Sequence, residues 1–208
     1  MRFKDRKEAG KLLAEKLLPY KGKEAVVYAV PRGGVVLGKE IADALNIPLD
    51  LVITRKIGHP SNPEYAVCVV AENHHIVCNP EEKSALDEKW LAKAVEEERQ
   101  EAIRRRKVYL GDWKRPDVAG KTAIVVDDGV ATGMTFLMAL KEARHLKPTK
   151  LVAAVPVLPA EMLSKIREEA DEVVYLDAPA DFAGAVGAYY DEFPQVSDEE
   201  VIGLLAGV

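Results

Sequence analysis

Residues 124–135 read IVVDDGVATGMT, and this stretch joins two kinds of local structure. Its first residues are apolar and β-branched, as in a buried strand, and the strand ends at two adjacent acids, Asp127 and Asp128. Small residues follow, among them Gly129 and Gly133, and a helix is expected to begin there. A helix N-terminus offers unpaired N–H groups and the positive end of a dipole. The stretch therefore predicts a phosphate-binding loop at the carboxyl end of a strand.

The two acids indicate a ligand that carries more than a phosphate. A carboxylate repels a phosphate at close range, so Asp127 and Asp128 should face another part of the same molecule. A ribose 5-phosphate fits this arrangement, with its phosphate in the loop and its vicinal hydroxyls on the acids. The stretch has neither the glycine pattern of dinucleotide-binding folds nor the lysine of nucleotide-binding P-loops, so both of those interpretations lose their main support.

The same stretch closely resembles the binding motif for phosphoribosyl pyrophosphate (PRPP) in the type I phosphoribosyltransferases. The shared pattern is a few strand residues, two acids, small residues, then Thr-Gly and Thr. The resemblance extends over roughly residues 25–71 and 121–191. It implies that Asp127 and Asp128 bind the ribose hydroxyls. It also implies that the loop wraps the 5-phosphate through Gly129, Val130, Ala131, Thr132, Gly133, Met134 and Thr135.

An earlier part of the chain has the order strand, glycine turn, helix, strand. We expect strands over 25–30 and 49–54, with a helix over 35–45 between them, and such a unit implies parallel pairing with a right-handed crossover. The resemblance makes the intervening turn a pyrophosphate loop. Arg32 would supply charge, while Gly33 and Gly34 would let the backbone approach the ligand. The resemblance also predicts a cis peptide bond between Pro31 and Arg32.

Residues 55–63 read RKIGHPSNP, a composition that predicts a loop. By resemblance, a mobile cover over the active site begins here, and Lys56 would contact pyrophosphate; the alternative is that Arg55 and Lys56 are solvated charges beside a turn. The resemblance also implies Mg²⁺, which would arrive with the pyrophosphate and keep several waters. No cluster of His, Cys and carboxylate residues has metal-ligand spacing, so no metal site held by the protein alone is expected.

The whole chain, residues 1–208, is expected to form a single α/β domain with a central, mostly parallel twisted sheet flanked by helices. This is the type I phosphoribosyltransferase fold, with two additions. A helical insertion is expected over 78–116, where 81–110 is highly charged, and a small hood over 177–196. Strands over 66–71 and 76–78 could form a hairpin around Asn73 and His74. Ser197 could cap a final helix together with Glu200.

The acceptor of the phosphoribosyl group is suggested by residues 179–193, which resemble a stretch of purine-salvage members of the family. There an aromatic ring stacks on the base, and the resemblance gives that role to Phe182; a plain core phenylalanine is the alternative. Members that use hypoxanthine or guanine have an acid where this chain has Ala131, so the base stays open. A nucleobase is expected, with a purine slightly favoured.

Composition excludes several other classes of protein. Hydrophobic residues make up 48% and charged residues 30% of the 208 residues, which argues against disorder. The net charge of -5 argues against a nucleic-acid surface, and no apolar run approaches membrane-spanning length. The two cysteines, Cys68 and Cys78, have apolar neighbours and are expected to be buried thiols without a disulfide, which favours a cytoplasmic location.

The sequence therefore predicts a phosphoribosyltransferase that moves the 5-phosphoribosyl group from PRPP to a small-molecule acceptor and releases pyrophosphate. A homo-oligomer is expected by analogy with the family. Two alternatives stay open: a non-catalytic regulatory protein that binds PRPP, and a different nucleotide-binding α/β enzyme.

Overall fold

A parallel sheet of five strands forms the centre of the computed structural model, which describes residues 1–73 and 75–206. The strand order is β2-β1-β6-β7-β8, and every neighbouring pair is parallel. The strands are β1 (Ala25–Ala29), β2 (Leu49–Leu51), β6 (Thr122–Val126), β7 (Lys150–Val157) and β8 (Glu172–Asp177). The expected α/β fold with a parallel sheet is confirmed.

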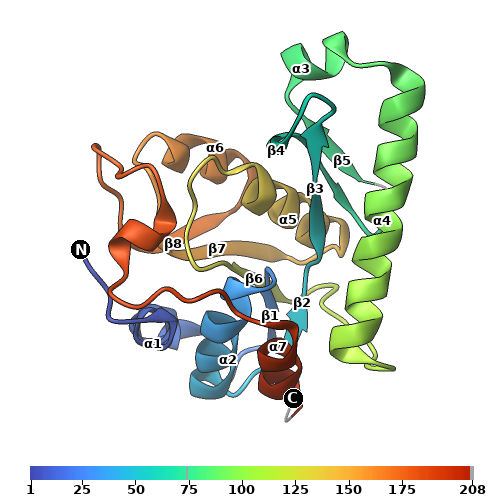
Figure 1. Cartoon of the computed structure of the whole chain (residues 1–208). Coiled ribbons are helices and arrows are strands. Elements are labelled where there is room, and N and C mark those ends of the chain that lie inside the picture. Colours follow the sequence, from blue (N-terminus) through green and yellow to red (C-terminus); the bar gives the residue numbers. More distant parts are fainter. Residues whose placement is uncertain (74, 207–208) are drawn as a thin grey trace.

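Helices cover both faces of this sheet, as Figure 1 shows. The helices α1 (Arg6–Leu17), α2 (Gly33–Leu45) and α7 (Asp198–Leu205) lie on one face, and α5 (Met134–His145) and α6 (Met162–Glu169) lie on the other. In β1, Val27 and Ala29 pack into the first core, while Val26 and Tyr28 pack into the second. Because successive strand residues point to opposite faces, one short apolar strand serves two cores.

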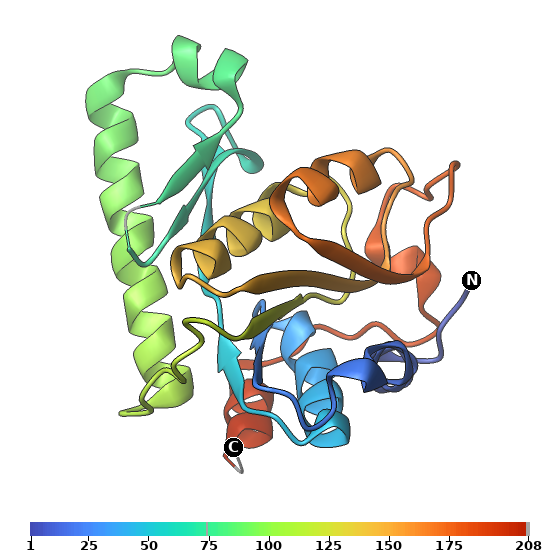
Figure 2. The same cartoon turned by 180° about the vertical axis from the view of Figure 1, so that it is seen from behind.

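A second, antiparallel sheet stands beside the first and consists of β3 (Thr54–His59), β4 (Asn62–Ala71) and β5 (Ile76–Cys78). The short helix α3 (Pro80–Ala85) and the long helix α4 (Glu88–Leu110) follow it, and α4 runs along this sheet (Figure 2). The expected hairpin of β4 and β5 is confirmed, although His74 in its connection lies outside the described residues. The expected helical stretch is also confirmed, as two helices.

The loop expected over 55–63 is wrong, because most of it is β-structure. β3 and β4 pair along their length and are joined by a turn at Pro60 and Ser61. The pairing is irregular at Gly58, where a Cβ atom would lie 2.0 Å from the carbonyl oxygen of Pro63. Glycine and proline therefore mark a bulge and a tight turn within one hairpin. The strand expected over 49–54 is correspondingly shorter, since it leaves the central sheet after Leu51.

The expectation of two free thiols is also wrong, because Cys68 and Cys78 form a disulfide. The two residues are direct partners in the antiparallel pair of β4 and β5, with their Cα atoms 4.0 Å apart. Sequence spacing did not indicate the bond, because the register of the hairpin brings the two residues together. The cytoplasmic location loses the argument from free thiols and stays a prediction. Within the described residues, every helix is too short or too polar to cross a bilayer.

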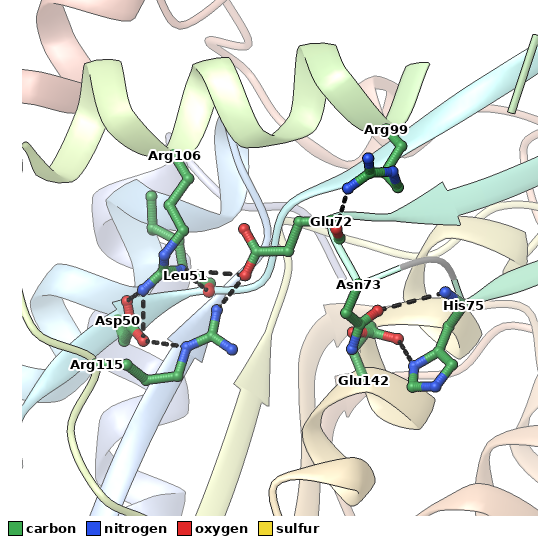
Figure 3. A network of polar contacts seen from close by, with 9 residues as sticks. All are labelled: Asp50, Leu51, Glu72, Asn73, His75, Arg99, Arg106, Arg115 and Glu142. Atoms are coloured by element: carbon green, nitrogen blue, oxygen red, sulfur yellow. Dashed lines mark hydrogen bonds and ion pairs between the residues drawn. The ribbon is translucent and has the colours of Figure 1, made fainter. Parts of the chain in front are cut away.

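An ion-pair network fastens α4 and the second sheet to the edge of the central sheet (Figure 3). Asp50 of β2 is fully buried, and its carboxylate accepts hydrogen bonds from Arg106 at 2.9 Å and from Arg115 at 3.2 Å. Arg106 also donates to the carbonyl oxygen of Leu51 at 3.1 Å, and both arginines pair with Glu72, the first residue after β4. A buried carboxylate requires such partners, and here they are two arginines, one from α4 and one from the segment that follows it.

The C-terminal part of the chain crosses back over the ends of the central strands. After β8 it is irregular apart from a 3₁₀ turn over Val186–Tyr189, and it reaches the N-terminus, where Phe3 bridges to Tyr190. The last helix begins as expected, because the Ser197 side chain and the Glu200 side chain form a capping box.

Candidate active site

A cavity of about 710 Å³ lies at the carboxyl ends of β1 and β6, within the size range of small-molecule sites. Its floor is the loop between β6 and α5, one wall is the β3–β4 hairpin, and α4 and the C-terminal segment contribute one side chain each. The lining residues are Val30, Pro31, Thr54, Arg55, Lys56, Pro63, Ala66, Arg105, Asp127, Gly129, Val130, Ala131, Thr132, Gly133, Thr135, Phe136 and Val186. The loop predicted from the sequence therefore faces the largest described cavity.

The loop ends in the left-handed residue Gly133, which precedes the first turn of α5 with φ of 82°. The backbone angle favours glycine, and a Cβ atom there would also require the terminal methyl of Met162, 2.0 Å away, to move. Among the described residues, no side chain caps this helix start. The N–H groups of the first turn are thus left for a ligand, and an anion is the ligand that they favour. Thr132 and Thr135 line the same end of the cavity.

The two acids differ in their surroundings. Asp127 lines the cavity, and its Oδ1 accepts the N–H of Asp128 at 2.8 Å. Asp128 does not line it; its Oδ2 accepts a hydrogen bond from Nε of Arg6 at 2.7 Å, and its carbonyl oxygen accepts one from the Tyr190 hydroxyl at 2.6 Å. Asp127 is therefore directed at the ligand space, whereas Asp128 is held by the two ends of the chain.

Arg6 is a site residue that the sequence reasoning missed. Its guanidinium lies 3.6 Å from the centre of the Phe193 ring, and it also donates to the carbonyl oxygen of Pro194 at 2.6 Å. The side chain is only 10% exposed. Along the sequence Arg6 looks like one charge among many on an amphipathic helix, and no local signal links it to an acid 122 residues away.

Burial raises the pKa of Asp127 well above its ordinary value, and the neighbouring Asp128 raises it further. The N–H of Asp128, Arg6 and Lys56 act in the opposite direction. Burial also raises the pKa of Asp128, against the opposing charge of Arg6. The ionised carboxylates are therefore unfavourable in the folded protein, and a bound cation or hydroxyl donors of a ligand would stabilise them.

The Pro31–Arg32 bond is cis, as expected from the resemblance. A Cβ atom at Gly33 would lie 1.9 Å from Oδ2 of Asp128, and one at Gly34 would lie 2.9 Å from the carbonyl oxygen of Val126. The two glycines thus let this turn pack directly on the acids. The Arg32 side chain turns away from the cavity, and its guanidinium lies 3.5 Å from Asp198 of α7.

Basic side chains also line the cavity. Lys56 is exposed and lines it, as does Arg55, which pairs with Glu98 at 2.7 Å. Arg105 reaches the cavity from α4 and pairs with Glu101 at 2.9 Å. A Glu–Arg pair four residues apart supports a helix but says nothing about what lies beyond it, so the sequence did not indicate Arg105 as a site residue.

The aromatic ring expected at the base is placed elsewhere. Phe182 stacks on Tyr189, with ring centres 5.1 Å apart, and packs against the core rather than lining the cavity. Val186, four residues later, is the lining residue from this segment. The structure thus brings together Lys56, Asp127, residues 129–133 and Thr135 around the cavity, and it leaves the side chains of Arg32, Asp128, Met134 and Phe182 outside the lining.

Replacing Asp127 with Asn should stabilise the fold at neutral pH. Because the pKa of this buried acid is raised, folding favours its protonated form, and stability is lost as pH rises from the ordinary pKa through the raised one. Asn keeps an oxygen for the N–H of Asp128 and carries no charge. Urea midpoints should be higher for D127N than for the unchanged protein at about pH 7, and should converge at about pH 4.

The exposed Asp117 gives a matched control, since its Oδ1 also accepts a backbone N–H, from Ala119 at 3.0 Å. D117N should show no such dependence on pH. A D127N protein that is less stable than the unchanged protein at neutral pH would contradict this account of the acid.

Comparisons with known proteins identify the family. Residues 4–193 match a family model described as the phosphoribosyl transferase domain. A Mycobacterium tuberculosis protein, provisionally named a phosphoribosyl transferase, is 38% identical over 205 residues, and the match takes in 98% of this chain. The match covers 46% of that protein, and the same holds for its counterpart in a second strain. The chain therefore spans about half the length of the curated relatives it matches.

Solved structures agree with this result. The crystal structure of a Thermus thermophilus protein has a TM-score of 0.83 at 40% identity, covering 100% of this chain and 99% of that one. A Neisseria gonorrhoeae protein with bound ppGpp has a TM-score of 0.51 at 17% identity, covering 100% and 98%, which supports the fold alone. With its matching motif, fold and relatives, the chain belongs to the phosphoribosyl transferase family.

Proposed function

We propose that this protein transfers the 5-phosphoribosyl group of PRPP to a nucleobase and releases pyrophosphate. The observation that carries the proposal is a single cavity that combines an acid, a free helix start and basic side chains. Asp127 and the uncapped start of α5 line it, and so do Lys56 and Arg105. PRPP has the matching parts: a 5-phosphate and ribose hydroxyls at one end, and a pyrophosphate at the anomeric carbon.

Each group then has a separate task. The N–H groups and hydroxyls of residues 129–135 would bind the 5-phosphate, and Asp127 would accept hydrogen bonds from the ribose hydroxyls. Asp128 would hold Asp127 and the turn at Gly33 in place, because it is anchored by Arg6. Before the ligand binds, Asp128 would keep Asp127 and this turn in position. In the complex, we expect Asp128 to contact the ribose directly.

The reaction breaks the bond between the anomeric carbon and a pyrophosphate oxygen. A ring nitrogen of the nucleobase forms the new bond to that carbon, and the proton on this nitrogen is released. Negative charge grows on the leaving pyrophosphate, and Lys56 and Arg105 are placed to stabilise it. The β3–β4 hairpin that carries Lys56 would limit access of water to the reacting carbon.

Mg²⁺ is expected to enter with PRPP. The carboxylates of Asp127 and Asp128 provide hard oxygen donors beside the cavity, which suit a hydrated Mg²⁺ ion. When bound, the ion would add positive charge next to the leaving group.

The acceptor is proposed only as a nucleobase. The preference for a purine rested on Phe182, whose ring packs on Tyr189 instead of lining the cavity. The cytoplasmic location stays a prediction, and the homo-oligomer stays an expectation by analogy with the family. The chain spans about half the length of its curated relatives, so the activity of the whole protein is a proposal.

Replacing Arg105 with Ala should weaken the reaction far more than replacing Arg104. Both arginines pair with Glu101, but Arg104 is 59% exposed and does not line the cavity. A charge-assisted contact to the leaving group is worth about 1.5–3 kcal/mol, so kcat/KM for PRPP should fall by roughly 10- to 100-fold in R105A. R104A should stay close to the unchanged protein. Equal effects in the two variants would contradict a role of Arg105 in the cavity.

The function itself is tested by pyrophosphate release from Mg²⁺–PRPP with a panel of purine and pyrimidine bases. Release that depends on one base, and that is lost in D127N/D128N, would support the transferase and name its acceptor. PRPP binding without release, lost in the same double variant, would instead support the non-catalytic regulatory protein. Release unaffected by the double substitution would contradict the proposed site.

A further inference from the structure

A second cluster of polar side chains lies away from the cavity, between the β4–β5 hairpin and the last turn of α5. It consists of His75, Glu142 and His145, whose nitrogen and oxygen atoms all lie within 4.8 Å of one another. Nδ1 of His75 is 2.5 Å from Oε1 of Glu142, a contact visible in Figure 3, and the two imidazole rings stack with their centres 3.7 Å apart. No local pattern in the sequence indicates this cluster, because 67 residues separate His75 from Glu142.

Glu142 is the unusual member, because it is a buried carboxylate, 8% exposed at its side chain. A buried carboxylate is costly unless a positive charge is beside it. Among the ion pairs of the described residues, its partner is His75, an imidazole that is charged only when protonated. Lys141, its neighbour on α5, pairs with Glu169 instead. The site thus presents one buried negative charge to two imidazoles, an arrangement that a divalent cation would neutralise.

The second histidine has a ring nitrogen available for a metal ion. Nδ1 of His145 lies 2.7 Å from the carbonyl oxygen of Lys141, and a carbonyl can only accept a hydrogen bond, so Nδ1 carries the proton. This leaves a lone pair on Nε2. Histidines that bind metals commonly donate their other ring N–H to a backbone carbonyl in this way.

We propose that His75, Glu142 and His145 bind one zinc ion, or a transition-metal ion of similar preference. Two imidazoles and a carboxylate suit zinc, whereas Mg²⁺ prefers an all-oxygen set. Ligand atoms about 2.1 Å from a tetrahedral ion lie about 3.4 Å apart, so the contact between His75 and Glu142 must lengthen by about 0.9 Å from its 2.5 Å. Both imidazoles are partly or fully exposed, which leaves the rings free to turn their edges toward the ion.

The ion would act as a clamp rather than as a second reaction centre. His75 directly precedes β5, whereas Glu142 and His145 lie on α5, so the ion would join two separate elements. α5 begins at the phosphate loop, and the hairpin sheet carries Lys56, so the clamp would join two walls of the main cavity. An apolar contact of Val69 and Ala71 with Met138 already packs the same two elements together.

Metal binding can be measured without any assay of transfer, so the outcome is independent of the proposed function. The protein is freed of metal with a chelator and kept without reductant, so that Cys68 and Cys78 stay bridged. Titration calorimetry with Zn²⁺ should give one site per chain, and Co²⁺ should give visible d–d absorption. Mg²⁺ should not compete.

The variants H75A and H145A should each weaken Zn²⁺ binding by about tenfold or more, since even partners of metal ligands contribute that much. H59A is the matched control, because the His59 ring lies at the far turn of the hairpin and accepts the N–H of Ser61 at 3.1 Å. Should a variant fold poorly, the melting temperature of the unchanged protein gives a second measurement. It should rise clearly when Zn²⁺ is added. The proposal is overturned by the absence of a stoichiometric site, or by binding that H75A and H145A leave intact or that H59A reduces equally.

Discussion

Two neighbouring carboxylates lose most of their water at the end of β6, and the parts of the chain around them compensate for that loss. Burial raises the pKa of both Asp127 and Asp128, and the guanidinium that pairs with Asp128 comes from Arg6 in the first helix. Gly33 lies where any side chain would strike Asp128. Because α5 starts only a few residues later, acids and free N–H groups follow one another along a single loop. A ligand with adjacent hydroxyls and a phosphate would donate hydrogen bonds to the acids and accept them from the N–H groups.

Much of the structure follows from local chemistry that can be read in the sequence. The apolar strands, the double acid, the glycines and the capping residues each determine backbone conformation within a few residues. The parallel sheet and the loop between β6 and α5 followed from them. The cis bond at Pro31 came from resemblance to a family rather than from any local rule. Apart from that bond, the features predicted correctly are those whose backbone geometry depends only on residues close in sequence.

The features that the sequence did not predict depend on contacts between distant residues. The pairing of Cys68 with Cys78 is set by hairpin register, and Gly58 marked a bulge where composition suggested a loop. Arg6 and Arg105 look like ordinary charges on amphipathic helices until the fold brings them to the acids and to the cavity. The cluster at Glu142 arises in the same way, since the end of α5 meets a hairpin from another part of the chain.

The central claim is that the loop after β6 binds the 5-phosphate of PRPP while the acids face its ribose. A crystal structure of the protein soaked or grown with PRPP and Mg²⁺ tests this most directly. The account predicts the 5-phosphate against the N–H groups of residues 129–135, the ribose hydroxyls at Asp127 and Asp128, and the pyrophosphate toward Lys56 and Arg105. A 5-phosphate bound against Lys56 and Arg105, or PRPP bound outside this cavity, would contradict it.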